Sequence, residues 1–133
     1  MMKLIVGTKG TGKTKTMVDA INAVTKTTKG NVVVLEQSMQ LTYDVDHAAR
    51  LIDVEDYKIH GYQAMYGFVA GVLAGNYDIT DLFIDGLMKI VDKDVSGLVD
   101  FLEAVEAVAG NTNVTLTLSL APEALPEGAK KYL

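Results

Sequence analysis

The chain has 133 residues, of which 49% are hydrophobic and 22% are charged, and it carries a net charge of -5. These totals are typical of one globular domain, so we expect residues 1–133 to fold as a single unit with a core of its own. The acidic balance disfavours a broad cationic surface, and we expect no nucleic-acid partner. The chain contains no cysteine, which excludes disulfides, thiolate zinc sites and cysteine nucleophiles.

The hydropathy pattern predicts a soluble, cytoplasmic protein without a membrane partner. The apolar run before Gly7 is short and has no small-residue cleavage site, so it does not resemble a signal peptide. The longest apolar stretch, residues 64–74, is interrupted by Tyr66 and two glycines. It is far shorter than the roughly 20 residues that are needed to cross a bilayer.

Predicted strands and helices alternate along the chain. Apolar runs typical of buried strands occupy residues 4–6, 32–35 and 81–86. Apolar residues at helical spacing predict helices at residues 13–28, 59–75 and 94–109. The third helix is expected to take Asp94 as its N-cap. Alternating apolar and hydroxyl residues predict a fourth core strand at residues 114–120, and residues 39–43 and 49–54 predict two short extended pieces.

This alternation predicts an α/β fold, with a three-layer parallel sheet of four to five strands and flanking helices. The tail, residues 121–133, contains Pro122 and Pro126 and is too short for another crossover and parallel strand. Without a further strand, the first strand lies at an edge of the sheet. Exposed edges are commonly covered by a helix or a second subunit, so we expect self-association or another protein partner.

The segment from residue 7 to residue 14, here called the glycine loop, matches the pattern GxxxxGK[ST]. It follows a predicted strand and opens a predicted helix, as phosphate binding requires. Glycines let successive backbone N–H groups converge on phosphates, and the helix N-terminus adds partial positive charge. Lys13 is expected to reach the β- and γ-phosphates, and the Thr14 hydroxyl to bind Mg²⁺. The residues expected to bind the cofactor are Gly7, Thr8, Lys9, Gly10, Thr11, Gly12, Lys13 and Thr14.

On this loop and the order of the elements, the chain resembles the P-loop NTPase superfamily, as a truncated form of that fold. The resemblance implies ATP and Mg²⁺ as cofactors. Asp85, which ends a hydrophobic strand, resembles the Walker B aspartate; Thr14 and Asp85 are then the metal ligands, and Lys13 and Asp85 act in catalysis. Residues 114–120 resemble the extra strand of the ASCE division, which lies between the P-loop and Walker B strands. Ser119 then resembles a polar sensor of the γ-phosphate, with a simple strand-end serine as the alternative.

Several positions depart from the pattern of that superfamily. Gly86 stands where many ASCE ATPases carry a glutamate that polarises the attacking water, which puts fast hydrolysis in doubt. Glu36, at the end of the neighbouring strand, is the candidate general base, with a solvated strand-end acid as the alternative. Arg50 is the only arginine, and it is either a finger for a neighbouring subunit or a surface residue. The NKxD guanine motif is absent, so a guanine-specific GTPase is not expected.

Three functions stay open on the sequence. The first is an ATP-binding protein with weak or partner-activated, magnesium-dependent ATP hydrolysis. The second is a nucleotide-dependent switch or assembly module that binds ATP without hydrolysing it. The third is an interaction domain whose loop binds only phosphate or sulfate. The chain is also similar to small bacterial P-loop proteins labelled as twitching-motility ATPases, a resemblance that implies nucleotide binding but not motor function.

Overall fold

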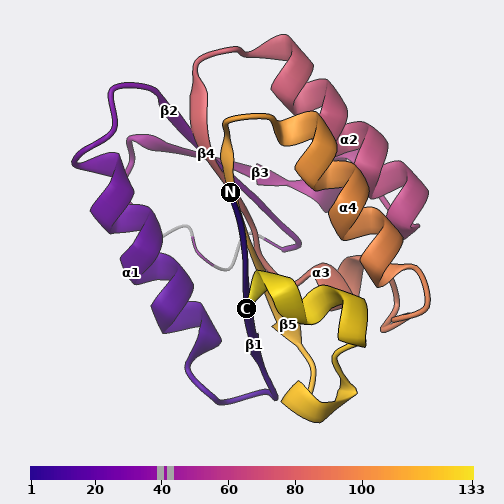
Figure 1. Cartoon of the computed structure of the whole chain (residues 1–133). Coiled ribbons are helices and arrows are strands. Elements are labelled where there is room, and N and C mark those ends of the chain that lie inside the picture. The colour runs from indigo at the N-terminus through magenta and orange to yellow at the C-terminus, as the bar shows by residue number, and fades with distance from the viewer. Residues whose placement is uncertain (39–40, 42–43) are drawn as a thin grey trace.

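Five parallel strands form one sheet, in the order β1-β5-β4-β2-β3, in a computed structural model that describes residues 1–38, 41 and 44–133 (Figure 1). The strands are β1 (Met2–Gly7), β2 (Asn31–Glu36), β3 (Ala49–Asp53), β4 (Ile79–Ile84) and β5 (Asn113–Ser119). All four strand pairings are parallel, so the carboxyl ends of the strands meet at the same edge of the sheet. The predicted α/β class with four to five parallel strands is confirmed.

Helices cover both faces of the sheet, which gives the three predicted layers. The α-helices are α1 (Lys13–Thr25), α2 (Gly61–Gly75), α3 (Leu87–Ile90) and α4 (Leu98–Ala109). Short 3-10 helices form η1 (Val54–Tyr57), η2 (Pro122–Ala124) and η3 (Glu127–Tyr132). Figure 1 shows α1 on one face of the sheet and the neighbouring helices α2 and α4 on the other.

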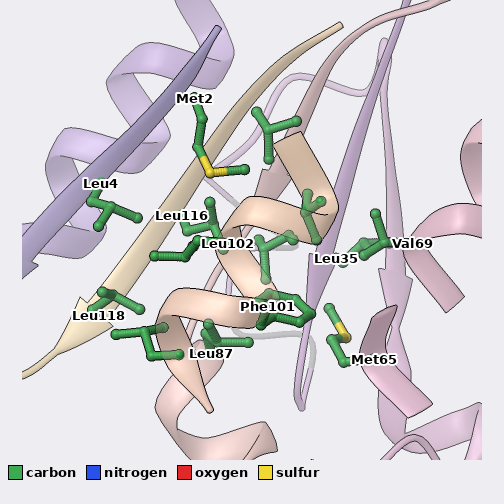
Figure 2. Close-up of a cluster of buried hydrophobic side chains, with 14 of the residues drawn as sticks. Met2, Leu4, Leu35, Met65, Val69, Leu87, Phe101, Leu102, Leu116 and Leu118 are labelled. Atoms are coloured by element: carbon green, nitrogen blue, oxygen red, sulfur yellow. The ribbon is translucent and has the colours of Figure 1, made fainter. Parts of the chain in front are cut away.

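Alternate residues of β2 supply the core on the two faces. Val34 packs in a cluster with Ile21 of α1, whereas Leu35 packs with Met65 of α2 and Leu102 of α4 on the opposite face. Figure 2 shows Leu35, Met65 and Leu102 within that second cluster. A strand that is buried on both faces needs a continuous apolar run, and residues 32–35 of β2 form such a run. Burying each such aliphatic side chain stabilises the fold by roughly 1.5–3 kcal/mol.

The strand that leads into the glycine loop lies at a sheet edge, as predicted. Within the described residues β1 pairs with β5 alone, and no strand follows β5 in the fully described tail. Instead, η3 contacts both β1 and α4, and Ala129 and Tyr132 are buried in the core cluster on the α2 and α4 face. The Tyr132 hydroxyl donates a hydrogen bond to Glu106 Oε1 at 2.9 Å. The C-terminal segment therefore packs beside the edge strand on one face.

The predicted start of α4 is wrong. The helix begins at Leu98, after Gly97, and not at a cap formed by Asp94. The Asp94 carboxylate instead accepts hydrogen bonds from the Ser96 N–H at 2.9 Å and the Ser96 hydroxyl at 2.6 Å. These bonds lower the pKa of Asp94 and close a local turn ahead of the helix.

Other boundaries differ by a few residues. Helix α1 ends at Thr25 rather than at residue 28, and α2 begins at Gly61 rather than at residue 59. The second extended piece is the strand β3, whereas the predicted piece at residues 39–43 lies outside the described residues except for Leu41, which lies in a turn. Helix α3 was not predicted, because four residues are too few to show helical periodicity.

Candidate functional site

The glycine loop joins the end of β1 to the start of α1 through left-handed backbone. Gly10 and Gly12 have φ angles of 85° and 87°, which side-chain-bearing residues rarely adopt, and Gly12 directly precedes the first residue of α1. A Cβ at Gly7 would overlap Thr11 Oγ1, so the Thr11 hydroxyl would have to leave its place beside the Thr8 carbonyl. The three glycines therefore set the path of the loop: Gly7 by space, Gly10 and Gly12 by conformation.

The loop is held closed around the carbonyl oxygen of Thr8. Lys13 Nζ donates a hydrogen bond to this oxygen at 2.9 Å, and the Thr11 hydroxyl donates another at 2.7 Å. The first turn of α1 carries no acidic residue, and no side chain of a described residue caps it. Its N–H groups and the partial positive charge of the helix are therefore available to an anion.

A cavity of ≈ 640 Å³ opens at the carboxyl edge of the sheet, next to the glycine loop. Its first wall is formed by Thr8, Lys9, Gly10, Gly12, Lys13 and Thr14. Its second wall comes from the segment after β4, with Asp85, Gly86, Met88, Lys89 and Lys93. Its floor includes Thr117 and Ser119 of β5. The volume falls in the range of about 300–1,000 Å³ that is typical of small-molecule sites.

The charge of the cavity is opposite to that of the whole chain. Its lining includes four lysines, namely Lys9, Lys13, Lys89 and Lys93, and a single carboxylate, Asp85. The chain as a whole has a net charge of -5. A local excess of ammonium groups in a concave site raises the local concentration of anions, so the cavity favours an anionic ligand.

Thr117 fixes the carboxylate of Asp85. The Thr117 hydroxyl donates a hydrogen bond to Asp85 Oδ1 at 2.7 Å and accepts one from the Gly86 N–H at 2.8 Å. Thr117 is only 2% exposed. The sequence pattern indicates Ser119 on this strand but not Thr117. In the sequence Thr117 is one of three alternating hydroxyl residues of this strand, and nothing in the pattern distinguishes it from Thr115.

The structure brings most of the predicted site residues together, but not all. Lys13, Thr14, Asp85 and Ser119 line the same cavity. Glu36 lies outside the described lining residues; it is 1% exposed, and its Oε1 accepts a hydrogen bond from the Leu41 N–H at 3.2 Å. The alternative that Glu36 is a solvated acid is therefore wrong, whereas its role as a general base stays a prediction.

Arg50 lies far from the cavity in the sheet. It is an exposed residue of β3, which forms the sheet edge opposite β1. Among the described residues that line the cavity, the cationic side chains are lysines, and Arg50 is not one of them. A role of Arg50 as a finger for a neighbouring subunit stays a prediction.

Thr14 and Asp85 could bind a metal ion whose other ligands come from a bound phosphate and from water. Among residues 1–38, 41 and 44–133, no group of three or more His, Cys, Asp or Glu side chains is arranged to hold a metal ion. Mg²⁺ in phosphate sites is commonly bound by one or two protein oxygens together with phosphate oxygens and water. A hydroxyl and a carboxylate on facing walls of a cationic cavity fit that kind of binding.

No family model and no curated protein matches the chain. In the described residues, every helix is too short or too polar to span a membrane.

Proposed function

We propose that the protein binds ATP together with Mg²⁺ in this cavity and hydrolyses it weakly, or rapidly only with a partner. The observation that carries the proposal is the uncapped N-terminus of α1, which opens from a glycine loop into a cavity lined by Lys13, Thr14 and Asp85. Adenine is proposed over guanine because the chain has no NKxD motif. We also propose a cytoplasmic location, where Mg-ATP is abundant.

The strand order supports a relationship to P-loop NTPases of the ASCE-like division. Strand β5 lies between β1, which enters the glycine loop, and β4, which is followed by Asp85. An inserted strand at this position is the arrangement that the resemblance implied. We therefore propose this relationship on the glycine loop, the helix that follows it and the strand order.

Each group of the site has a distinct part in binding. The Lys13 ammonium, which donates a hydrogen bond to the Thr8 carbonyl, would donate to phosphate oxygens instead. Backbone N–H groups of residues 10–14 would bind the remaining oxygens, and Thr14 and Asp85 would hold the metal. Thr117 keeps the Asp85 carboxylate in one orientation. Bound Mg²⁺ supplies charge neutralisation at the phosphates.

The second candidate is a switch or assembly module that binds ATP without hydrolysing it. Two observations favour it: Gly86 replaces the usual glutamate, and Glu36 is buried and hydrogen-bonded to the Leu41 amide. Turnover measurements on the parent and on Glu36→Gln separate the two candidates. Turnover that Glu36→Gln abolishes at unchanged ATP affinity supports hydrolysis. Tight Mg-ATP binding by a parent with no turnover, alone or with cell extract, supports the switch.

Calorimetric titration tests the proposal as a whole. The parent is expected to bind Mg-ATP more tightly than inorganic phosphate or sulfate, and to lose affinity when Mg²⁺ is chelated. Lys13→Ala is expected to weaken Mg-ATP binding at least about tenfold, because one charge-assisted contact contributes about 1.5–3 kcal/mol. Lys29→Ala, an exposed lysine in the turn before β2, is the control. Equal affinity for phosphate and ATP would instead support the phosphate-only domain.

A further inference from the structure

We propose that Lys89 and Lys93 bind the terminal phosphate and make the site discriminate ATP from ADP. This inference rests on the proposed function, since it assigns residues to a nucleotide in the same cavity. Both lysines follow Asp85 in the chain and line the same cavity as the glycine loop. The sequence patterns gave no role to either residue.

The segment that carries these lysines is anchored to the metal-ligand candidate. The Gly86 N–H is bound to the Thr117 hydroxyl, which in turn holds Asp85. The side chain of Lys89 lies beside Gly86: its Cδ is 3.9 Å from the position that a Cβ at Gly86 would occupy. Lys89 is thereby placed beside the residues that are expected to hold the metal at the terminal phosphates.

Lys93 occupies a strained position that glycine would fill more easily. Asp92 and Lys93 have φ angles of 53° and 62°, two successive left-handed residues that are not glycine. The Lys93 N–H donates a hydrogen bond to the Met88 carbonyl at 2.7 Å, which closes this turn. Backbone strain of this kind clusters at functional sites. Both residues are exposed, but Lys93 lines the cavity and Asp92 is not among the described lining residues.

The cavity lysines form no ion pair with a carboxylate of the described residues. Within the described part of the chain, none of Lys9, Lys13, Lys89 and Lys93 has a carboxylate oxygen within 4.0 Å. Four ammonium groups around one cavity repel one another, and a bound polyanion relieves this repulsion.

Both walls would contact a bound triphosphate. The backbone of the glycine loop would serve the inner phosphates and Lys13 the β- and γ-phosphates, whereas Lys89 and Lys93 lie on the Asp85 side of the cavity, where they would add contacts to the terminal phosphate of ATP. A diphosphate lacks the group that this second wall contacts. Arg50 is not among the described lining residues. Lys89 and Lys93 are therefore the cationic side chains on the Asp85 side of the cavity.

Calorimetric affinities for Mg-ATP and Mg-ADP test the inference. We expect Lys89→Gln and Lys93→Gln each to weaken Mg-ATP binding about tenfold or more, and to change Mg-ADP affinity less than about twofold. Lys93→Arg keeps the charge and should keep the ratio of ATP to ADP affinity. Lys29→Gln, outside the cavity, should change neither affinity.

Two glycine variants separate charge from loop conformation. Lys93→Gly and Asp92→Gly both remove left-handed strain, so both should raise the midpoint of urea unfolding. Only Lys93→Gly should lower the ratio of ATP to ADP affinity. An equal loss of ATP affinity in Asp92→Gly would overturn the inference, because loosening of the turn would then explain the effect.

The experiment also distinguishes this inference from the proposed function. A parent that binds neither nucleotide overturns both. A parent that binds Mg-ATP through Lys13, but whose Lys89→Gln and Lys93→Gln variants keep the parent ratio of ATP to ADP affinity, overturns this inference alone.

Discussion

The hydroxyl of Thr117 and the carboxylate of Asp85 form a 2.7 Å hydrogen bond across two neighbouring strands, and the same hydroxyl accepts the Gly86 N–H at 2.8 Å. One buried oxygen therefore fixes both the expected metal ligand and the turn that follows it. This contact connects the core of the sheet to the second wall of the cavity.

Thr117→Val keeps the shape of the side chain and removes both hydrogen bonds. We expect it to lower the free energy of unfolding by about 1–3 kcal/mol, because the Gly86 N–H loses its partner. Mg-ATP affinity should fall as well, since the Asp85 carboxylate is no longer oriented. Thr117→Ser should restore both properties, and Thr115→Val, two residues earlier on β5, is the control. Unchanged affinity in Thr117→Val would show that Asp85 orientation does not matter for binding.

Gly7→Ala should disrupt the glycine loop, because the added Cβ overlaps the Thr11 hydroxyl that caps the Thr8 carbonyl. Overpacking of this kind costs about 1–3 kcal/mol, and urea unfolding measures it. In the double variant Gly7→Ala/Thr11→Ala the overlapping oxygen is gone. Its loss of stability should therefore be smaller than the sum of the two single losses. Strict additivity would argue against this steric account.

Tyr62 makes the stability depend on pH in the alkaline range. Its hydroxyl donates a hydrogen bond to the Asp94 carbonyl, and burial, together with the Asp94 charge, raises its pKa to about 12. The folded state favours the neutral phenol. The contribution of Tyr62 to the free energy of unfolding is therefore complete below about pH 10, and it is lost as the pH rises through about 12.

Urea unfolding of the parent and of Tyr62→Phe at a series of pH values measures this contribution. The difference in free energy of unfolding should stay constant up to about pH 10 and shrink above it. Tyr77→Phe, at a side chain that is 94% exposed, is the control. A parent–variant difference that is independent of pH up to about 12 is the contrary result.

Self-association stays a prediction, because no strand of the described residues pairs with the outer side of β1 at the edge of the sheet. Sedimentation in Mg-ATP is expected to show an assembly larger than one chain whose population grows with protein concentration. A strict monomer across the accessible concentrations would rule out this expectation.

The order of elements and the first wall of the site were predictable because both have local signals. The GxxxxGK[ST] pattern marks the glycine loop, and the alternation of residues 114–120 marks β5. The predicted start of α4 is wrong because an aspartate is typical both of a helix N-cap and of a local turn. The side chain of Asp94 can serve either, and here it binds Ser96.

The second wall and the floor of the cavity depend on tertiary contacts. Thr117 faces Asp85 only because β5 pairs with β4 in one register, with Leu116 opposite Ile84. The burial of Glu36 depends on the packing around it, including the Leu41 amide that its carboxylate binds. One sequence contains no information of that kind about pairs of distant residues.

The binding site itself is located most directly by the backbone amide signals of the labelled protein during titration with Mg-ATP. The largest saturable shifts are expected in residues 8–14 and in Asp85 and Gly86. Much smaller shifts are expected at Tyr77, which precedes β4 at the amino ends of the strands, away from the cavity. In Lys13→Ala the shifts in the loop should require at least about tenfold more ligand. Saturable shifts confined to other surfaces, or no shifts at millimolar Mg-ATP, would contradict the assignment of this cavity as a nucleotide site.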